Sequence, residues 1–445
     1  MAQSPQPASP PAQQYRGNRS AVLLKDLKKL LGKVGPGFIT GAADDDPSGV
    51  ATYAQTGAIF GYSQLWLVWF TSPFMIVIQQ MCGRIGMVTG KGLAGVILDN
   101  YPKSVLYVTV SLLVVANTIN IGADLGAMAS SAQMLLGLPF LFWLVLITGS
   151  IIALEILVPY KIYSRILKYL ALTLFTYVLA AFVVRLDWDE VLYATLIPHI
   201  EISAAFLLNI VAILGTTISP YLFFWQASEE VEEEVADGRI PDMGIRRPCV
   251  TRQGIVEMNR DTVIGMFFSQ IIMFFIIVTT AATLHASGIT TIQTASQAAE
   301  ALRPLAGDLS YLLFAAGIIG TGLLAVPVLA GASAYAVAET AGLREGLGKN
   351  PGRAPGFYVV IALSVLVGMS LDLLGISPIT ALYYAAALNG LAAPPLMALV
   401  TRIANREDIM GRFVNSRESN ILGWVIVLIM ALTGAALIVN LAIGL

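Results

Sequence analysis

The stretch GPGFITGAADDDPSGVATYAQTGAIFG, residues 35–61, carries a run of acidic residues in the middle of an otherwise apolar segment. The acidic residues are Asp44, Asp45 and Asp46. Pro47 lacks a backbone donor and obstructs the preceding helical turn, and Gly49 tolerates non-helical torsion angles. We therefore predict a membrane helix that is interrupted at residues 44–49, where backbone carbonyl groups lose their intrahelical partners.

The three carboxylates need an explanation, because one Asp at the centre of a membrane helix costs about 2.5–3.5 kcal/mol on insertion scales. Such acids usually face a cavity or a cation, and a carboxylate beside free carbonyl oxygens is a ligand set for a hard cation. The alternative is an interfacial loop in which the acids are hydrated. Apolar sequence flanks the run on both sides without enough length for two spans, which favours the interrupted helix.

The composition indicates that lipid is the solvent for most of the chain. Hydrophobic residues make up 56% of the 445 residues and charged residues 12%, whereas soluble proteins carry roughly 25% charged residues. Two isolated cysteines, Cys82 and Cys249, offer neither a disulfide framework nor a cysteine metal cluster. The fold class predicted is therefore an all-α polytopic membrane protein.

Runs of about 20 apolar residues recur along the chain, and each can cross a hydrocarbon core of roughly 30 Å as a helix. We predict eleven spans, at residues 34–58, 62–82, 104–134, 139–158, 162–184, 202–235, 260–285, 309–341, 355–373, 377–403 and 420–444. Residues 1–30 are predicted to be a disordered cytoplasmic tail without the apolar core of a signal peptide. Residues 31–445 then form a single transmembrane domain.

The basic residues predict the orientation, since Lys and Arg collect in cytoplasmic loops. Six of them precede the first span, and with eleven spans the later clusters also fall on that side. Only Arg185 and Arg303 of the 26 basic residues fall outside. We expect a cell-membrane protein, in a prokaryotic inner membrane, with a cytoplasmic N-terminus and an outward C-terminus.

A second interruption is predicted in AILGTTISPYLFFWQASEEVEEE, residues 212–234. Its helix-breaking and polar residues are Gly215, Thr216, Thr217, Ser219 and Pro220. Alone, this pattern could be a proline kink whose hydroxyl groups bond back to their own helix. Paired interruptions at corresponding positions are, however, a pointer to an inverted-repeat transporter site. We place the first five-helix repeat at about 34–185, the second at about 200–403, and an extra helix at about 420–444.

These motifs resemble the Nramp family of divalent-metal transporters. The similarity rests on GPGFI followed by Asp-Pro-Ser-Gly at 46–49, Thr-Thr-Ile-Ser-Pro at 216–220, and Ala-Asp-Leu at 123–125, and it runs over the whole membrane region. The resemblance implies eleven helices, of which ten form two inverted repeats as in amino-acid transporters, and alternating access around a site at mid-membrane.

The departures from the family motifs suggest which ion is carried. Asp46 matches the metal-binding Asp, but Gly49 stands where the family has a ligating Asn, Thr216 where it has an Ala whose carbonyl ligates, and Ser219 where it has Met. Thioether sulfur favours transition metals, whereas carboxylate, carbonyl, hydroxyl and water favour Mg²⁺. The pattern is similar to that of the Nramp-related magnesium transporters. Drift within an ordinary manganese transporter is the alternative.

The same comparison bears on proton coupling. Family symporters have acids on the third helix and a His on the sixth, and those positions here hold Asn117, Ala127 and Tyr221, so only Asp124 remains. A proton relay needs titratable groups in sequence through the membrane. We therefore expect an alternating-access transporter of hydrated divalent cations, chiefly Mg²⁺ with Mn²⁺ as a further substrate, without proton coupling. A proton-coupled Mn²⁺ or Fe²⁺ symporter is the alternative.

Other polar residues are candidates for roles around the ion site. Asp44, Asp45, Tyr221, Asn117 and Asp124 are candidates for the ion pathway or for the surroundings of the site, with helix packing as the alternative for the third-helix residues. The glutamates at 229–234 predict either an acidic vestibule or a solvated helix end. His199 and His285 are expected at the surface.

No enzyme signature is present: the sequence has no His-Glu-x-x-His helix and no nucleophile elbow. A receptor would need a soluble output domain, and amino-acid transport fits poorly with three consecutive acids at the break. We expect no cofactor, no nucleic acid and no obligate protein partner. The expected partners are the divalent metal ion, as transported substrate, and the lipid bilayer.

Overall fold

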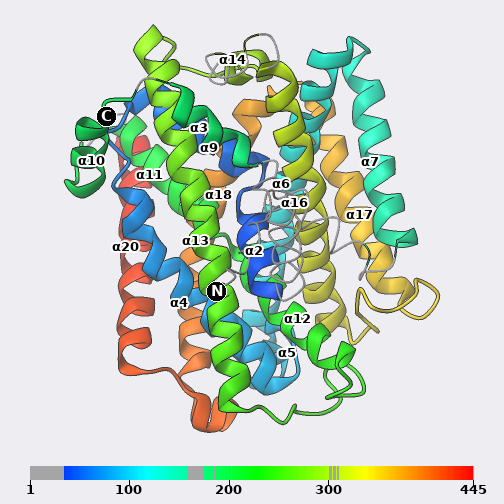
Figure 1. Cartoon of the computed structure of the whole chain (residues 1–445). Helices are drawn as coiled ribbons and strands as arrows, with labels where there is room; N and C mark the ends of the chain where they lie inside the picture. The colour runs from blue at the N-terminus through cyan, green and yellow to red at the C-terminus, as the bar shows by residue number, and fades with distance from the viewer. Residues whose placement is uncertain are drawn as a thin grey trace, which may run out of the picture. The chain divides into compact units, whose positions relative to one another are not determined.

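The computed structural model describes residues 35–158, 162, 174–184, 186–201, 203–299, 303, 307 and 310–443. The regular elements in these ranges are helices, and residues Pro36–Leu445 belong to one compact unit (Figure 1). The predicted tail at 1–30 lies outside the described residues. Residues 163–173 of the fifth predicted span, 162–184, also do, and α9 (Phe175–Val183) is the described helix within it.

Eight helical segments among the described residues are long and apolar enough to cross a membrane. They are α6 (Lys103–Leu136), α7 (Phe140–Leu157), α11 (Ala204–Thr217) together with α12 (Pro220–Ala236), α13 (Arg252–Thr283), α16 (Ser310–Ala341), α17 (Pro355–Leu371), α18 (Pro378–Ala404) and α20 (Arg417–Ile443). The bent pair of α4 (Leu67–Thr89) and α5 (Leu93–Asn100), with 67° between its members, is a ninth candidate. The multi-pass membrane fold predicted from composition is confirmed.

The first predicted span is divided, as expected, into α2 (Pro36–Asp44) and α3 (Pro47–Phe60). Asp46 is the N-cap of α3 with extended torsion angles (φ −65°, ψ 171°), and Pro47 occupies the first helical position. Proline is favoured there because its missing N–H would have no helical partner. The break covers only residues 45 and 46, which is shorter than the predicted 44–49.

The second interruption lies at residues 218 and 219, between α11 and α12. Ile218 ends α11 with φ −120° and ψ 60°, Ser219 is the N-cap of α12, and Pro220 is its first residue. Each break therefore joins the C-terminus of one short helix to the N-terminus of another. Helix N-termini carry partial positive charge and C-termini partial negative charge, so both signs are available at the breaks.

The half-helices pair with each other and are held by long helices. α2 contacts α12, α3 contacts α11, α13 lies along both α2 and α3, and α18 lies along α11 (Figure 1). Two glycines allow backbone contact in this assembly. A methyl group on Gly41 would lie 2.2 Å from the Gly265 carbonyl carbon on α13, and one on Gly215 would lie 2.1 Å from the Ala386 carbonyl oxygen on α18.

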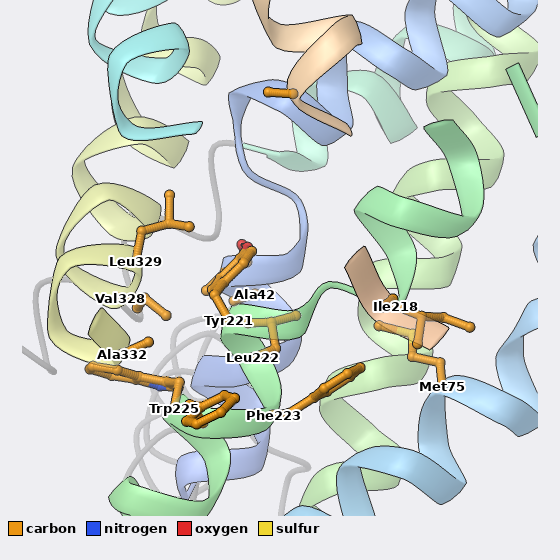
Figure 2. Close-up of a cluster of buried hydrophobic side chains, with 14 of the residues drawn as sticks. Ala42, Met75, Ile218, Tyr221, Leu222, Phe223, Trp225, Val328, Leu329 and Ala332 are labelled. Carbon is orange, nitrogen blue, oxygen red and sulfur yellow. The ribbon is translucent and has the colours of Figure 1, made fainter. Parts of the chain in front are cut away.

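A cluster of large apolar side chains fills the space on the α2–α12 side of the breaks. Figure 2 shows the first turns of α12 packed against α2, α4 and α16. The labelled members are Ala42, Met75, Ile218, Tyr221, Leu222, Phe223, Trp225, Val328, Leu329 and Ala332. Tyr221, Phe223 and Trp225 have no exposed surface, so this side of the breaks is sealed by packing.

Several helix ends differ from the predicted ones because polar residues extend helices beyond the apolar run. α13 begins at Arg252, not at 260, and Thr251 caps it by accepting a hydrogen bond from the Gly254 amide (3.0 Å). α4 lies at 67–89 and not at 62–82, because residues 61–66 form turns. Hydropathy locates the apolar centre of a helix and says little about capped polar ends.

Candidate functional site

Asp46 lies at the centre of the site and is 1% exposed. Its Oδ1 accepts hydrogen bonds from the Gly49 amide (2.6 Å) and the Ser48 hydroxyl (2.7 Å), and its Oδ2 accepts one from the Asn120 side-chain amide on α6 (2.9 Å). The sequence produces this arrangement locally, because an Asp at an N-cap accepts from the third residue of its helix. The carboxylate is therefore fixed by three donors at the positive end of α3.

Gly49 and Thr216 face each other across the two breaks. A methyl group on Gly49 would lie 3.1 Å from the Asp44 carbonyl oxygen, 3.2 Å from Thr216 Oγ1 and 3.4 Å from Asp46 Oδ1. The Thr216 hydroxyl is buried and has no hydrogen-bond partner. One point beside the Gly49 backbone is thus surrounded by a carbonyl, a hydroxyl and a carboxylate oxygen.

Asp44 and Asp45 lie on the α13 side of the break. The Ser269 hydroxyl donates to Asp44 Oδ2 (2.7 Å) and also lies 3.2 Å from Asp45 Oδ1. The other oxygens, Asp44 Oδ1 and Asp45 Oδ2, are buried without a partner. Both carboxylates border the break, and the main-chain carbonyl of Asp44 reaches the oxygen-lined point beside Gly49.

Two of the proposed site residues use their hydroxyl groups to satisfy freed carbonyl groups. Ser219 Oγ donates to the Gly215 and Thr216 carbonyl oxygens, both at 2.7 Å, which is the back-bonding alternative considered from the sequence. Tyr221 donates to the Ala43 carbonyl oxygen (2.8 Å) across the two breaks. Ser219 thus holds the end of α11, and Tyr221 ties α12 to α2.

The third-helix residues divide into two groups. Asn120 binds Asp46, and the Asp124 carboxylate, one turn along α6, is buried and neither of its oxygens has a hydrogen-bond partner. Asn117 turns away from the break and donates to the Leu329 carbonyl (3.0 Å) and to the Ser333 hydroxyl (2.9 Å) on α16. Its contacts are those of a helix-packing residue, and Asp124 belongs to the surroundings of the break.

The electrostatic feature of the site is buried negative charge. Asp44, Asp45, Asp46 and Asp124 are each at most 1% exposed, and no Lys, Arg or His of the described residues forms an ion pair with them. Buried charges are usually paired, bound to a metal or neutralised by protonation. Over the ranges that the structure describes, no three His, Cys, Asp or Glu side chains converge into a metal-holding group. Any ion held here therefore needs backbone, hydroxyl or water oxygens.

The residues at the second break are buried as well, since Thr216 and Ser219 are only 1% exposed. On the α3–α11 side, a cavity of about 530 Å³ reaches the α3 face at Ala51 and Gln55. Gln55 Oε1 accepts a hydrogen bond from the Ile292 amide (3.0 Å), so the segment before α14 (Ala295–Ala299) is tied to α3 at this cavity. The cavity approaches the break without reaching Asp46.

The glutamates at 229–234 form neither of the arrangements considered from the sequence. Glu229, Glu230, Glu232 and Glu234 are 2–8% exposed and Glu233 is exposed, so one face of the end of α12 is packed and Glu233 is solvated. Glu230 accepts from Gln226 (2.8 Å), and Glu232 accepts from the Tyr335 hydroxyl on α16 (2.8 Å). Glu232 therefore connects α12 to α16, whereas the bond of Glu230 lies within α12.

The arrangement defines a class of protein: an all-helical multi-pass membrane protein with two interrupted helices and an inverted-repeat transporter fold. The Eremococcus coleocola manganese transporter, crystallised with an aromatic bis-isothiourea substituted compound, is similar with a TM-score of 0.70 and 17% identity, over 93% of this chain and 87% of that chain. Mhp1, a nucleobase-cation-symport-1 family transporter with bromovinylhydantoin bound, is similar with a TM-score of 0.54 and 14% identity, over 92% and 91% of the two chains.

The family follows from the sequence match. Residues 37–440 match the family described as natural resistance-associated macrophage protein-like, or Nramp, and the chain belongs to this family. The divalent metal cation transporter MntH of Deinococcus radiodurans is 26% identical over 96% of this chain and 95% of its own length. The resemblance stated from the motifs at the two breaks is therefore confirmed at the level of the family.

Proposed function

We propose that this chain transports hydrated divalent cations, chiefly Mg²⁺ with Mn²⁺ as a further substrate, by alternating access at the two breaks and without proton coupling. Transport of a divalent metal agrees with its family and with the names of its relatives, which are a divalent metal cation transporter and a manganese transporter. The preference for Mg²⁺ is our inference from the residues of the site, as is its assignment to the magnesium branch of the family.

The observation that carries the proposal is the oxygen-lined point beside Gly49. The Asp44 carbonyl oxygen, Thr216 Oγ1 and Asp46 Oδ1 lie 3.1–3.4 Å from where a side chain on residue 49 would begin, so three oxygen atoms from both breaks converge on the Gly49 face. Mg²⁺ gives up water reluctantly and usually keeps several water ligands. A water of its hydration shell fits where an asparagine side chain would stand. Asp46 supplies the negative charge that attracts the ion, and Asp44, Thr216 and Ser219 line the space between the two breaks.

The absence of proton coupling is proposed from the surroundings of Asp124. The Asn117 side-chain amide donates hydrogen bonds to residues of α16, and the Tyr221 hydroxyl donates one to the Ala43 carbonyl oxygen. Neither residue offers a titratable group at neutral pH, and the further acids that approach this part of α6 are Asp46, through Asn120, and Asp372, against Gly126. A divalent ion that enters down a membrane potential of 100 mV, negative inside, gains about 4.6 kcal/mol, which suffices for accumulation.

A second candidate is a proton-coupled Mn²⁺ or Fe²⁺ symporter, and one contact favours it. Met273 on α13 places its thioether sulfur 3.9 Å from the Thr217 hydroxyl, next to the second break. A thioether that reached the ion would restore a preference for transition metals. Under this alternative, Met273→Leu should reduce Mn²⁺ uptake selectively. Under our proposal, it should leave the ratio of Mg²⁺ to Mn²⁺ uptake unchanged.

Orientation and repeat boundaries remain part of the proposal. We place the N-terminus in the cytoplasm and the C-terminus outside, in a prokaryotic inner membrane. The repeats are assigned to about 34–185 and 200–403. The cavity at Gln55 would then face outward, and the apolar cluster around Trp225 would close the inner side.

Calorimetric titration of the purified protein with Mg²⁺ and Mn²⁺ tests the site. Asp46→Asn should abolish binding of both ions, and Thr216→Val should weaken Mg²⁺ binding more than Thr217→Val does, because only the Thr216 hydroxyl faces Gly49. Asp189→Asn, at an exposed acid of α10 (Trp188–Leu196), is the matched control and should change nothing. Unchanged Mg²⁺ binding in Asp46→Asn would refute the site.

A further inference from the structure

A group of arginines lies at the membrane-surface end of α13, away from the ion site. The connection between α12 and α13 runs along the lower end of the view in Figure 1 and approaches the orange turn after α18. Arg246, Arg247 and Arg252 lie on this connection, and Arg412, from the turn, donates to the Val250 carbonyl (3.4 Å). All four are exposed, and we call them the arginine patch.

The patch is compact and its backbone is fixed. Residues 246–252 span at most about 20 Å even when fully extended. The Gly244 amide donates to the Gly90 carbonyl (2.8 Å), and a methyl group on Gly90 would lie 2.6 Å from the Arg246 carbonyl oxygen, so the connection packs directly on the end of α4. The arginines are therefore presented by a fixed surface of the protein.

The guanidinium groups of the patch lack acidic partners. In the parts of the chain that the structure describes, no carboxylate forms an ion pair with any of the four. The acid that precedes them, Asp242, is paired with Lys349 at 2.6 Å, and Glu257 accepts from Gln253 at 2.9 Å. Unpaired guanidinium groups in a fixed fork match the geometry of phosphate oxygens.

The patch also carries apolar side chains that suit an interface with lipid. Ile245 is 67% exposed and Val256 is 63% exposed, next to Arg246 and one turn beyond Arg252. The 32 residues of α13 extend about 48 Å, whereas a hydrocarbon core is roughly 30 Å thick. The first turns of α13 therefore reach the headgroup layer, where basic and apolar side chains are found together.

We propose that the arginine patch binds the headgroup of an anionic phospholipid. The charge of the patch is opposite to that of such a lipid, and Ile245 and Val256 would contact its acyl chains. A loop that only oriented the protein in the membrane would need positive charge but no cluster of arginines on a connection whose backbone is fixed. The lipid would hold the connection that leads out of α12, which is the second half of an interrupted helix. The inference is independent of which ion is carried.

Native mass spectrometry of the full chain tests the proposal, with phosphatidylglycerol and phosphatidylcholine titrated in parallel. The double variant Arg246→Gln/Arg247→Gln should weaken phosphatidylglycerol binding about fivefold for each arginine, the factor that corresponds to about 1 kcal/mol. Arg344→Gln/Arg353→Gln is the matched control, because it removes two exposed arginines from the connection between α16 and α17. This control should bind as the wild type does.

Equal losses in both double variants would mean diffuse surface charge and would overturn the proposal, as would no loss in either. A wild-type protein without preference for phosphatidylglycerol over phosphatidylcholine would also overturn it, whatever the variants do. Inorganic phosphate should fail to displace the lipid, and displacement at equal concentration would indicate a free-anion site instead. Arg246→Lys/Arg247→Lys, which keeps the charge, should bind with intermediate affinity and guards against misfolding of the Gln variant.

Discussion

Gly49→Ala is the smallest change that fills the oxygen-lined point beside the first break. The new methyl group would lie 3.1 Å, 3.2 Å and 3.4 Å from three oxygen atoms and would project from the face toward which a hydrated ion is proposed to bind. A hydrogen bond to a charged group contributes about 1.5–3 kcal/mol, so losing one such bond weakens Mg²⁺ binding about 10- to 150-fold. Alanine is favoured over glycine in a helix by about 1 kcal/mol, whereas the contact of the new methyl group with the Asp44 carbonyl oxygen at 3.1 Å is tight and opposes that gain.

Uptake of Mg²⁺ and Mn²⁺ into proteoliposomes measures this effect. Gly49→Ala should raise the Mg²⁺ concentration needed for half-maximal uptake by at least tenfold and should affect Mn²⁺ less, since Mn²⁺ gives up water more readily than Mg²⁺ does. The matched control is Gly149→Ala on α7, where a methyl group would meet no atom within 4 Å. Unchanged Mg²⁺ uptake in Gly49→Ala, or an equal loss for both ions, would refute the reasoning about hydration.

Three further predictions concern other parts of the molecule. Asp46→Asn should lower uptake of every divalent ion at least about thirtyfold, because removing one partner of a buried charge interaction costs 2 kcal/mol or more, and residual uptake near the wild-type rate would contradict this. Trp225→Ala should lower thermal stability by about 3–5 kcal/mol because it leaves a cavity in the sealed cluster, and an unchanged melting temperature would count against that packing. Burial, followed by the charges of Glu339 and Glu232, raises the pKa of Glu345 to about 10. The wild type should therefore lose stability relative to Glu345→Gln as the pH rises from about 5 to 9, and thermal unfolding at several pH values would show no such trend if the carboxyl were free.

The two breaks could be predicted from sequence because the chemistry that makes them is local. At the first break, Asp46 fixes the N-cap and Pro47 the first helical position, and Pro220 fixes the first helical position at the second break. These signals can be recognised without knowing which helices pack against the breaks. The resemblance to the family used the same residues. The apolar runs likewise predicted the long helices, because the thickness of the bilayer sets the length of a membrane helix.

The contacts between helices could not be predicted from the sequence in this way. Ser269 lies 225 residues from Asp44, and nothing in its own apolar helix distinguishes it from a packing serine. Asn117 and Asn120 share one polar stripe on α6, yet the structure turns Asn120 to Asp46 and Asn117 to α16. Which residue of a stripe faces a site depends on how helices pack, and periodicity alone contains no such information.

Coupling and selectivity together test the central claim most directly. Mg²⁺ and Mn²⁺ uptake would be measured in proteoliposomes under an imposed membrane potential, with a pH dye inside the same vesicles. The account predicts saturable Mg²⁺ entry that is lost in Asp46→Ala and leaves the internal pH unchanged. Mn²⁺ entry with exclusion of Mg²⁺ and with internal acidification would contradict it, and would identify a proton-coupled transition-metal symporter.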